Sequence, residues 1–229
     1  MGVGQGLLTS RGVGRPRNEL LSLRRQEEIL GAAAKLFARD GYNNTTTQAV
    51  ADLLQVGKGT IYRYFPTKRQ LFLAAVDRMM WLLRETIESQ VAQIDDPLER
   101  IAKAIETYLA FFAEHPESVE LLIQERAQFK DREKPTYFQH RDATVERVRV
   151  LFRRLIAEGR MRDIPVERAA DVMNDLVYGT MFTNYFTGRR RSPVQQAKDI
   201  MDLFFLGILS EPERRARGAA GPGSSQAPI

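Results

Sequence analysis

Residues 41–68 constrain the fold of this chain more than any other stretch, because they predict two short helices around a tight turn. Thr45 can cap the first helix, and Gln48, three residues later, completes a capping box. This helix is expected to end near Leu54. Gly57 opens the second helix, which a proline stops nine residues later. The side chains expected to be buried are Val50, Leu53, Leu54, Ile61 and Phe65.

The second of these helices, expected to run to about Tyr64, is small at its start and rich in Lys, Thr, Tyr and Arg. A helix that enters the major groove of DNA needs little bulk at its tip and donors for phosphates and base edges. The stretch therefore favours binding of duplex DNA.

The charge of the chain is concentrated in its first third. Residues 1–70 carry 11 Lys and Arg against 5 Asp and Glu, whereas the remainder carries 23 against 24. A basic module beside a neutral one is typical of a polyanion-binding head on a body with another task. Chance clustering of solvated arginines is the alternative.

Composition excludes several classes of protein. With 229 residues, 43% of them apolar, the chain can bury a core, so it is not globally disordered. It has no cysteine, which excludes disulfides, zinc fingers and thiol nucleophiles. It shows neither the apolar segment of a signal peptide nor a run near the ~20 apolar residues that span a bilayer. We therefore expect a soluble, cytoplasmic protein that does not enter a membrane.

The two ends of the chain are expected to lack a packed structure. Residues 1–22 are Gly-rich and predict a flexible basic arm, and residues 211–229 predict a disordered tail. Within the arm, Arg15 and Arg17 flank a proline, and an extended segment of this kind is narrow enough for a DNA minor groove. An ordinary disordered basic tail is the alternative.

Between these ends, the prolines, glycines and capping residues that bound each helical segment predict an all-α fold of about nine helices, with no strand. Residues 23–70 are expected to form the helix-turn-helix DNA-binding domain, and residues 71–210 a helical ligand-binding and dimerisation domain. Apart from the two short helices above, helices are expected over 24–39 (ended by Gly41), 68–94, from Pro97, from Pro116, from Pro135 to Gly159, 165–186 and 193–210.

The last two of these helices, within 166–186 and 193–210, are apolar over most of their circumference. Such a helix is either central in one domain or shared between a core and another subunit. Two of them at the end of a modest domain favour a homodimer interface that resembles a four-helix bundle. A core formed entirely within one chain is the alternative.

The order of residues around the predicted turn closely resembles the DNA-binding region of TetR-family transcriptional regulators. The resemblance covers roughly residues 24–72, and beyond residue 75 it is only architectural. The residues that carry it are Gly41-Tyr42, Thr45-Thr46, Val50-Ala51, Val56, Lys58-Gly59-Thr60-Ile61-Tyr62, Tyr64-Phe65 and Lys68.

The resemblance implies a homodimer whose two heads bind a near-palindromic operator in double-stranded DNA, most simply as a repressor. By position, Lys58, Gly59 and Tyr62 match residues at the groove floor, with Gln48 reaching from the preceding helix. Positions that match phosphate contacts are Thr46, Thr47, Thr60, Tyr64 and Lys68.

Chemistry agrees with part of this assignment. Threonines at a helix N-terminus present hydroxyls and free N–H groups to a phosphate. Lys68 opens a long helix, where the helix dipole disfavours a cation, and a bound phosphate would account for it. Tyr62 or Tyr64 packing against the first helix is the alternative for those two side chains.

Two positions depart from the family pattern. Gln55 stands in the interhelical turn where the family usually has Gly, and a left-handed conformation there costs on the order of 1 kcal/mol. Gly57 stands where a Ser is common, which removes a hydroxyl that could contact a phosphate. Both departures make the operator harder to predict.

In this family the regulatory domain usually holds a ligand among its middle helices, and the long helix after Lys68 would transmit its effect. The resemblance therefore implies a small-molecule effector, expected to be mainly apolar or aromatic and oriented by Asn174, Glu125 or Arg126. The candidate lining residues are Trp81, Tyr108, Phe112, Phe129, Asn174 and Tyr178. These residues suit a plain core equally well.

The sequence does not favour an enzyme. Its two histidines, His115 and His140, lie in no metal-binding or nucleophile motif. We expect no catalytic residue, no metal and no cofactor. The more serious rival is a dimeric DNA-binding protein without a small-molecule effector, either architectural or recruited by another protein. A closable cavity would favour the effector, and a solid core would favour the rival.

Overall fold

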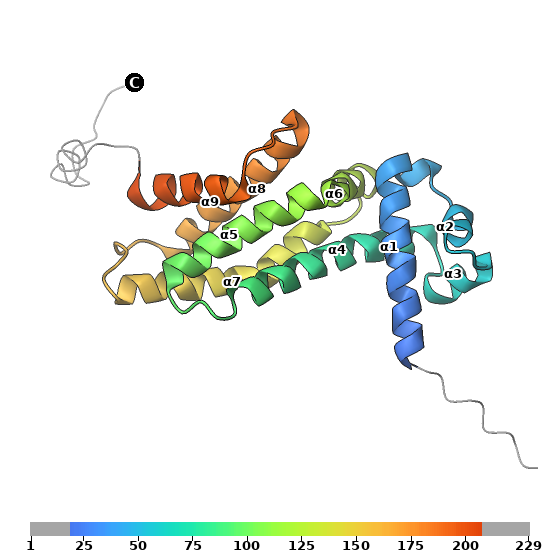
Figure 1. Cartoon of the computed structure of the whole chain (residues 1–229), viewed down its shortest axis with the longest axis horizontal. Coiled ribbons are helices and arrows are strands. Elements are labelled where there is room, and N and C mark those ends of the chain that lie inside the picture. Colours follow the sequence, from blue (N-terminus) through green and yellow to red (C-terminus); the bar gives the residue numbers. More distant parts are fainter. Residues whose placement is uncertain (1–18, 208–229) are drawn as a thin grey trace, which may run out of the picture.

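The computed structural model describes residues 19–207, and within that range the chain is all-α, as predicted, with nine α-helices, a closing π-helical turn and no strand. A small head at one end of an elongated molecule contains three helices, and the others form the body (Figure 1). The elements are α1 (Glu19–Asn44), α2 (Thr47–Leu53), α3 (Lys58–Tyr64), α4 (Lys68–Val91), α5 (Pro97–Glu114), α6 (Pro116–Gln128), α7 (Thr136–Ala157), α8 (Val166–Thr187), α9 (Pro193–Met201) and η1 (Asp202–Leu206).

Side-chain caps and prolines set most of the helix starts. Thr67 accepts a hydrogen bond from the N–H of Gln70 at the start of α4, and Asp96 does the same for two N–H groups at the start of α5. A proline occupies the first turn of α5, α6 and α9, where its missing N–H costs nothing. The capping residues and prolines of the sequence predict these helix starts.

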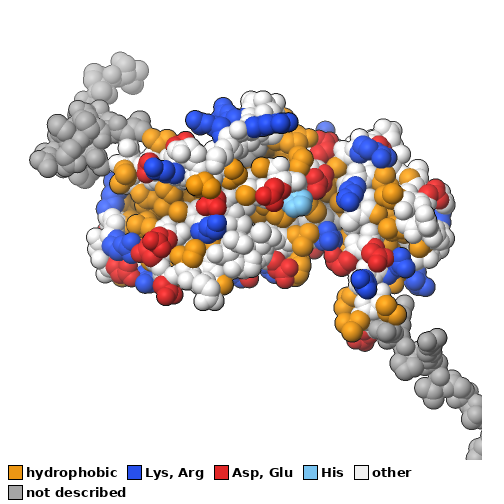
Figure 2. Space-filling model, viewed as in Figure 1, with side chains coloured by type: hydrophobic (Ala, Val, Ile, Leu, Met, Phe, Trp, Pro, Cys, Tyr) orange, Lys and Arg blue, Asp and Glu red, His pale blue; other side chains and the backbone are white. Residues whose placement is uncertain are grey.

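The first helix is longer than predicted. α1 begins at Glu19, so residues 19–22 are helical and do not belong to a flexible arm. Contacts with later elements explain the difference, because the Ser22 hydroxyl donates to the phenol oxygen of Tyr64 at 3.5 Å and Glu27 pairs with Arg78 of α4. Exposed leucines at this end of α1 form an apolar projection from the head (Figure 2).

Gly41 interrupts α1 as predicted, with a φ of 82°, but the chain resumes a helical turn to Asn44. The predicted end of the last helix, near residue 210, is only partly described. The α-helical part of α9 ends at Met201, and a π-helical turn continues to Leu206. Arg15, Arg17 and the tail from residue 208 lie outside the described residues.

The cap of α2 was predicted wrongly. Thr46 is the N-cap and accepts a hydrogen bond from the N–H of Ala49, whereas Thr45 is buried and donates to main-chain carbonyls of α1. Gln48 therefore forms no capping box, and its amide donates to Asp52 instead. Leu53, predicted to be buried, is 55% exposed because the short helix turns that side to solvent.

One hydrophobic core runs through both the head and the body. Phe37 of α1 and Phe72 of α4 are fully buried at the junction, with their ring centroids 5.0 Å apart and perpendicular. Tyr42 and Phe129 complete this aromatic cluster. Because burial of each large aromatic side chain stabilises a core by roughly 1.5–3 kcal/mol, the head is held against the body by packing as well as by the chain connection.

Candidate nucleic-acid interface

The turn between α2 and α3 fixes the angle of the second helix. Gln55 adopts the left-handed conformation, with a φ of 54°, despite the steric cost to a non-glycine residue, and the N–H of Val56 donates to the carbonyl of Ala51 at 2.9 Å. Val50 and Ile61 are fully buried between the two helices. One face of α3 is therefore fastened to the head, and the other faces solvent.

The solvent face of α3 carries the residues that the sequence places at a groove floor. Lys58, Gly59 and Tyr62 are all exposed, and the Lys58 ammonium lies 5.5 Å from the centre of the Tyr62 ring. A Cβ atom at Gly59 would meet no other atom of the chain within 4 Å. Nothing within the head requires glycine at position 59, whereas close approach of a DNA base pair would.

Thr47 has a different place from its neighbours at the start of α2. Its side chain is only 5% exposed, and its hydroxyl donates to the phenol oxygen of Tyr62 at 3.1 Å. Thr47 thus positions Tyr62. Thr46 and Gln48 remain exposed beside it, and Thr60 is half-buried at the start of α3.

Tyr64 and Lys68 both make contacts inside the head. The Arg63 guanidinium lies 5.2 Å from the Tyr64 ring centre, and Tyr64 is half-buried. Lys68 lies 4.5 Å from the centre of the Tyr42 ring and donates to the carbonyl of Asn43 at 3.1 Å. Partial burial lowers the pKa of Lys68. These contacts give the lysine at the start of α4 an internal partner in addition to any phosphate.

The predicted ligand-binding residues do not form one group. Tyr108 and Phe112 pack at 4.9 Å in the interior of the body, where the Tyr108 hydroxyl lies 2.9 Å from that of Tyr137. Trp81 is 42% exposed on α4, and Phe129 lies in the aromatic cluster between head and body. These two side chains are therefore separated from the others.

Asn174 and Glu125, both expected to orient a ligand, differ in the contacts that their side chains make. The amide nitrogen of Asn174 is buried without a hydrogen-bond partner among the described residues. Glu125, expected to orient a ligand, instead accepts hydrogen bonds from the N–H and hydroxyl of Thr136 and lies 3.2 Å from Arg132. Glu125 therefore fastens the connection between α6 and α7.

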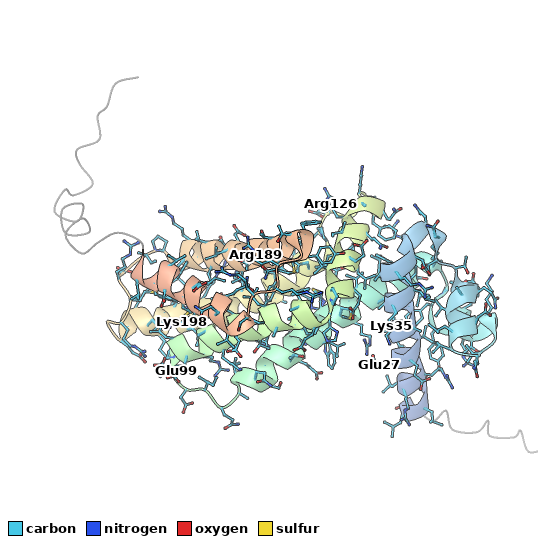
Figure 3. All side chains as sticks on the ribbon, turned by 45° about the horizontal axis from the view of Figure 1, so that its top comes forward. Glu27, Lys35, Glu99, Arg126, Arg189 and Lys198 are labelled. Atoms are coloured by element: carbon cyan, nitrogen blue, oxygen red, sulfur yellow. The ribbon has the colours of Figure 1, made fainter. Side chains whose placement is uncertain are left out.

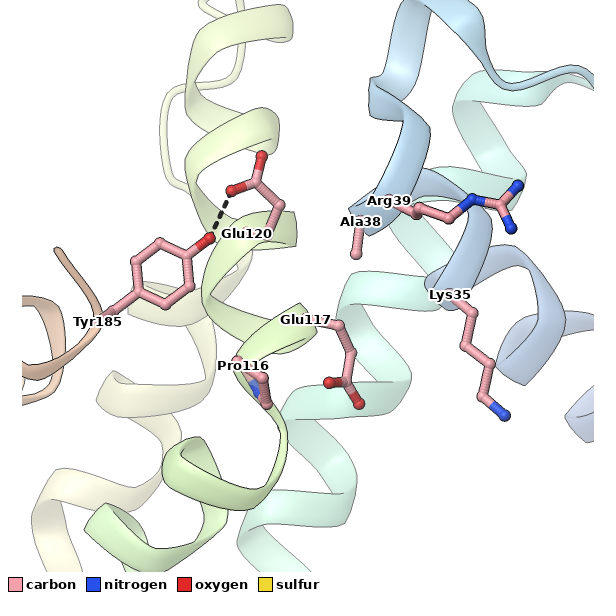
Figure 4. Close-up of a pocket in the computed structure, with 7 residues that line it drawn as sticks. All are labelled: Lys35, Ala38, Arg39, Pro116, Glu117, Glu120 and Tyr185. Atoms are coloured by element: carbon pink, nitrogen blue, oxygen red, sulfur yellow. Dashed lines mark hydrogen bonds between the residues drawn. The ribbon is translucent and has the colours of Figure 1, made fainter. Parts of the chain in front are cut away.

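One surface hollow lies between the head and the body, and another lies on the body. The first, of about 430 Å³, lies where α1, α6 and α8 meet, and Tyr185 donates to Glu120 across it at 2.8 Å (Figure 4). The second, of about 500 Å³, lies between α6 and α8. Of the six predicted lining residues only Tyr178 lines either hollow, and Arg126, expected to orient a ligand, lines the second. The second hollow is lined by Leu122, Ile123, Arg126, Ala127, Lys130, Tyr178 and Phe182.

Family models match both parts of the chain. Residues 29–75 match the bacterial regulatory proteins of the tetR family, and residues 94–208 match the tetracyclin repressor-like C-terminal domain. The chain belongs to the TetR family of bacterial regulatory proteins. Within residues 19–207, no helix of this TetR-family chain is long and apolar enough to cross a membrane.

Individual relatives match only part of this TetR-family chain. The transcriptional regulator HbdR of Aromatoleum sp. (strain CIB) is 31% identical over 86 residues, which is 38% of this chain and 38% of HbdR, less than half of that relative's length. The nucleoid occlusion factor SlmA of Vibrio vulnificus (strain YJ016) is 27% identical over 152 residues, 62% of this chain and 74% of SlmA.

Solved structures share the fold. The regulator FadR from Bacillus subtilis, in complex with stearoyl-CoA, superposes with a TM-score of 0.69 over 80% of this chain and 99% of FadR, at 17% identity.

Proposed function

We propose that this TetR-family regulator binds a near-palindromic operator as a homodimer in the cytoplasm and represses transcription until a small molecule releases it. DNA binding is supported by the observation that α3 has one buried side and one exposed side. Ile61 fastens one side to the head, while Lys58, Gly59 and Tyr62 are exposed on the other. A rigid helix with exposed donors is what direct recognition of base edges needs.

A stripe on α8 supports the dimer. Its residues follow a spacing of four, three, four and three, as in the seam of a coiled coil, and all are exposed. Val172 is 53% exposed and Phe186 is 68% exposed, which is costly for a solvated surface. The stripe comprises Val172, Leu176, Gly179, Thr183 and Phe186, and α9 adds exposed Val194 and η1 exposed Leu203 and Leu206.

Two observations support release by a small molecule: the family of the chain and a hollow on its surface. The name of the C-terminal family model is that of a repressor, and FadR was crystallised with an acyl-CoA. A surface hollow of about 500 Å³ in this chain is within the usual size of ligand sites.

A DNA-binding dimer without a small-molecule effector is the second candidate. Two observations favour it: the interior around Tyr108 and Phe112 is filled by aromatic side chains, and the match to SlmA, a nucleoid occlusion factor, spans 74% of that relative. Both candidates share the DNA-binding head and the dimer.

Selection of bound sites from random duplex DNA tests the proposal, with the stoichiometry measured on the same preparation. Recovery of a near-palindrome bound by two chains supports the regulator. Tight, salt-sensitive binding without a recovered sequence supports the second candidate. A Lys58→Ala/Tyr62→Ala double variant is the control, since it must fail to enrich the same sequence if α3 is the reading helix.

A further inference from the structure

The hollow between α6 and α8 is an open groove with an apolar floor. Leu122 is buried in it, and Ile123, Tyr178 and Phe182 are half-buried. The centre of the Tyr178 ring lies 4.8 Å from that of Phe182 and 4.6 Å from that of Tyr137 on α7. The side of the groove formed by α8 is therefore supported by packing against α7. A braced aromatic wall loses little conformational entropy when a ligand packs against it.

The groove has two positively charged side chains in its lining. Arg126 lies on α6 and Lys130 follows two residues after the end of that helix, and both line the groove and are exposed. Arg126 projects from α6 into solvent (Figure 3). Neither cation forms an ion pair or hydrogen bond with any of residues 19–207, whereas Arg141, Arg147, Arg153, Arg154 and Arg160 on and after α7 all pair with acids.

The acids adjacent to these two cations in sequence are both engaged elsewhere. Asp131, which follows Lys130, pairs with Arg69 of α4 at 2.6 Å. Glu125 is 1% exposed, and its carboxylate is engaged by Thr136 and Arg132 on the inner side of α6. No acidic residue lines the groove. The groove therefore presents an apolar floor and two uncompensated positive charges, which complement a molecule that is apolar at one end and anionic at the other.

We propose that the groove between α6 and α8 binds a small amphipathic anion, a hydrocarbon chain or aromatic ring that carries a carboxylate or phosphate. The apolar part lies on Ile123, Tyr178 and Phe182, and the anionic group is bound by Arg126 and Lys130. This inference rests on the proposed function, since it identifies the chemical class of the releasing molecule and its place.

The groove stays accessible in the proposed dimer. Tyr178 and Phe182 lie about a quarter of a turn around α8 from the exposed stripe that contains Val172, Leu176 and Phe186. A partner chain packed on that stripe leaves the α6 side of α8 open. Dimerisation and ligand binding therefore use different faces of one helix.

α6 connects the groove with the DNA-binding head. The amide of Gln124, on the side of α6 away from the groove, donates to the carbonyl of Phe37 in α1 at 2.9 Å. Beyond the end of α6, Asp131 accepts from Arg69 at the start of α4 at 2.6 Å. A ligand that displaces α6 from α8 shifts both contacts, and with them the position of the head, so it favours one arrangement of the dimer.

The first test is calorimetry on the full-length chain without DNA, with decanoate and decyl phosphate as probes. Decanol and decyltrimethylammonium are the uncharged and cationic controls. We expect both anions to bind at least about tenfold more tightly than either control, which corresponds to about 1.4 kcal/mol, because only an anion forms charge-assisted hydrogen bonds with the two cations. Equal binding of decanol and decanoate would overturn the role of the cations.

Three variants locate the site. Arg126→Gln/Lys130→Gln is expected to weaken decanoate binding by at least about tenfold. Arg162→Gln/Arg168→Gln removes the same charge from exposed arginines outside the groove and is expected to leave binding unchanged. Ala127→Glu, at an exposed helical position between the two cations, is expected to weaken anion binding by repulsion without unfolding the chain. Unchanged binding in the first and third variants would place the site elsewhere.

Two further outcomes separate the alternatives. Flotation of the chain with phosphatidylglycerol vesicles, lost in the Arg126→Gln/Lys130→Gln variant, would identify a membrane surface as the partner and overturn the small-molecule site. If the groove binds decanoate but no operator is selected, the site stands and the proposed function fails. If a palindrome is selected but no anion binds, the proposed operator binding stands and the anion site fails.

Discussion

The side-chain amide of Gln124 on α6 donates a hydrogen bond of 2.9 Å to the main-chain carbonyl of Phe37 on α1. Both residues are buried, at 9% and 0% exposure, so the bond crosses the junction between the body and the DNA-binding head in the absence of bulk water. A main-chain carbonyl cannot move without the helix that carries it. The position of α6 and the position of the head are therefore linked by a specific contact as well as by packing.

Replacing Gln124 by Met keeps the volume of the side chain and removes its amide donor, which bonds the carbonyl of Phe37 and also the carboxylate of Glu120 at 3.0 Å. We expect the free energy of unfolding to fall by about 1 kcal/mol, the usual net contribution of a buried hydrogen bond. Urea unfolding followed by circular dichroism measures the change. Gln90→Met, at an exposed position near the end of α4, is the matched control and is expected to have no effect. Equal stability of the two variants would show that the bond across the junction contributes nothing.

Tyr62 is the residue whose removal should most affect operator recognition. It is 41% exposed on α3, and its hydroxyl is held by that of Thr47 at 3.1 Å. We expect Tyr62→Ala to lower affinity for the selected operator at least about tenfold, because one good base contact contributes about 1–3 kcal/mol. Fluorescence anisotropy with the operator and with a scrambled duplex measures this.

Tyr62→Phe and Thr47→Val separate the ring of Tyr62 from the placement of its hydroxyl. Each removes one partner of the hydroxyl pair, and each should leave the head folded, since the core of Val50 and Ile61 is untouched. A Tyr62→Ala variant that loses operator and scrambled DNA to the same extent would mean that Tyr62 contacts phosphate alone.

Gln55 is the only non-glycine residue with a positive φ among residues 19–207. Glycine at this position removes the steric cost of the left-handed conformation, so Gln55→Gly is expected to raise the free energy of unfolding by up to about 1 kcal/mol. Gln55→Val should lower it, because a β-branched side chain is least suited to this conformation. Denaturant unfolding of the three proteins gives the order, and a valine variant as stable as the glycine variant would contradict it.

Local signals predicted most of the helix boundaries. Thr67 before Lys68 marks the start of α4, and Asp96 before Pro97 marks the start of α5, as the sequence predicts. Signals of this kind depend on a few neighbouring residues, so a single sequence contains them. The choice between Thr45 and Thr46 as cap did not follow, because burial of Thr45 against carbonyls of α1 decides it.

The candidate ligand site depended on contacts between distant segments and was only partly predictable. Trp81 follows Met79 and Met80, and the sequence does not show that the two methionines face the core while the tryptophan faces solvent. Arg126 was a candidate for orienting a ligand, but its neighbours across the groove come from α8, more than 50 residues later. Helix periodicity gives the apolar side of each helix, and the pairing of helices decides what that side meets.

The dimer prediction is tested on α8. Leu176→Glu places a charge in the middle of the exposed stripe, where Leu176 is 40% exposed in the single chain. We expect sedimentation equilibrium to show dissociation, because a buried unpaired carboxylate opposes association strongly. Leu20→Glu is the matched control on the head, at 77% exposure, and should remain a dimer. A Leu176→Glu dimer of unchanged stability would move the interface to another surface.

The last prediction concerns alkaline pH and the interior of the body. Burial raises the pKa of Tyr108 well above its usual value, and burial also raises the pKa of Tyr137. The folded chain therefore keeps both phenolic protons at a pH where the unfolded chain loses them. Since the unfolded state then binds fewer protons, stability falls as the pH rises above about 10, the ordinary pKa of tyrosine.

Each of these two phenols should contribute a fall of about 1.4 kcal/mol per pH unit in that range. Tyr108→Phe/Tyr137→Phe removes both hydroxyls of the 2.9 Å pair together, so neither is left buried without its partner. Thermal unfolding between about pH 8 and pH 11 should show a shallower decline for this variant. A residual slope is expected, because burial also raises the pKa of Tyr178, and burial together with Glu120 raises that of Tyr185 to about 12. Parallel pH curves for the two proteins would mean that the interior phenols are not held neutral by burial.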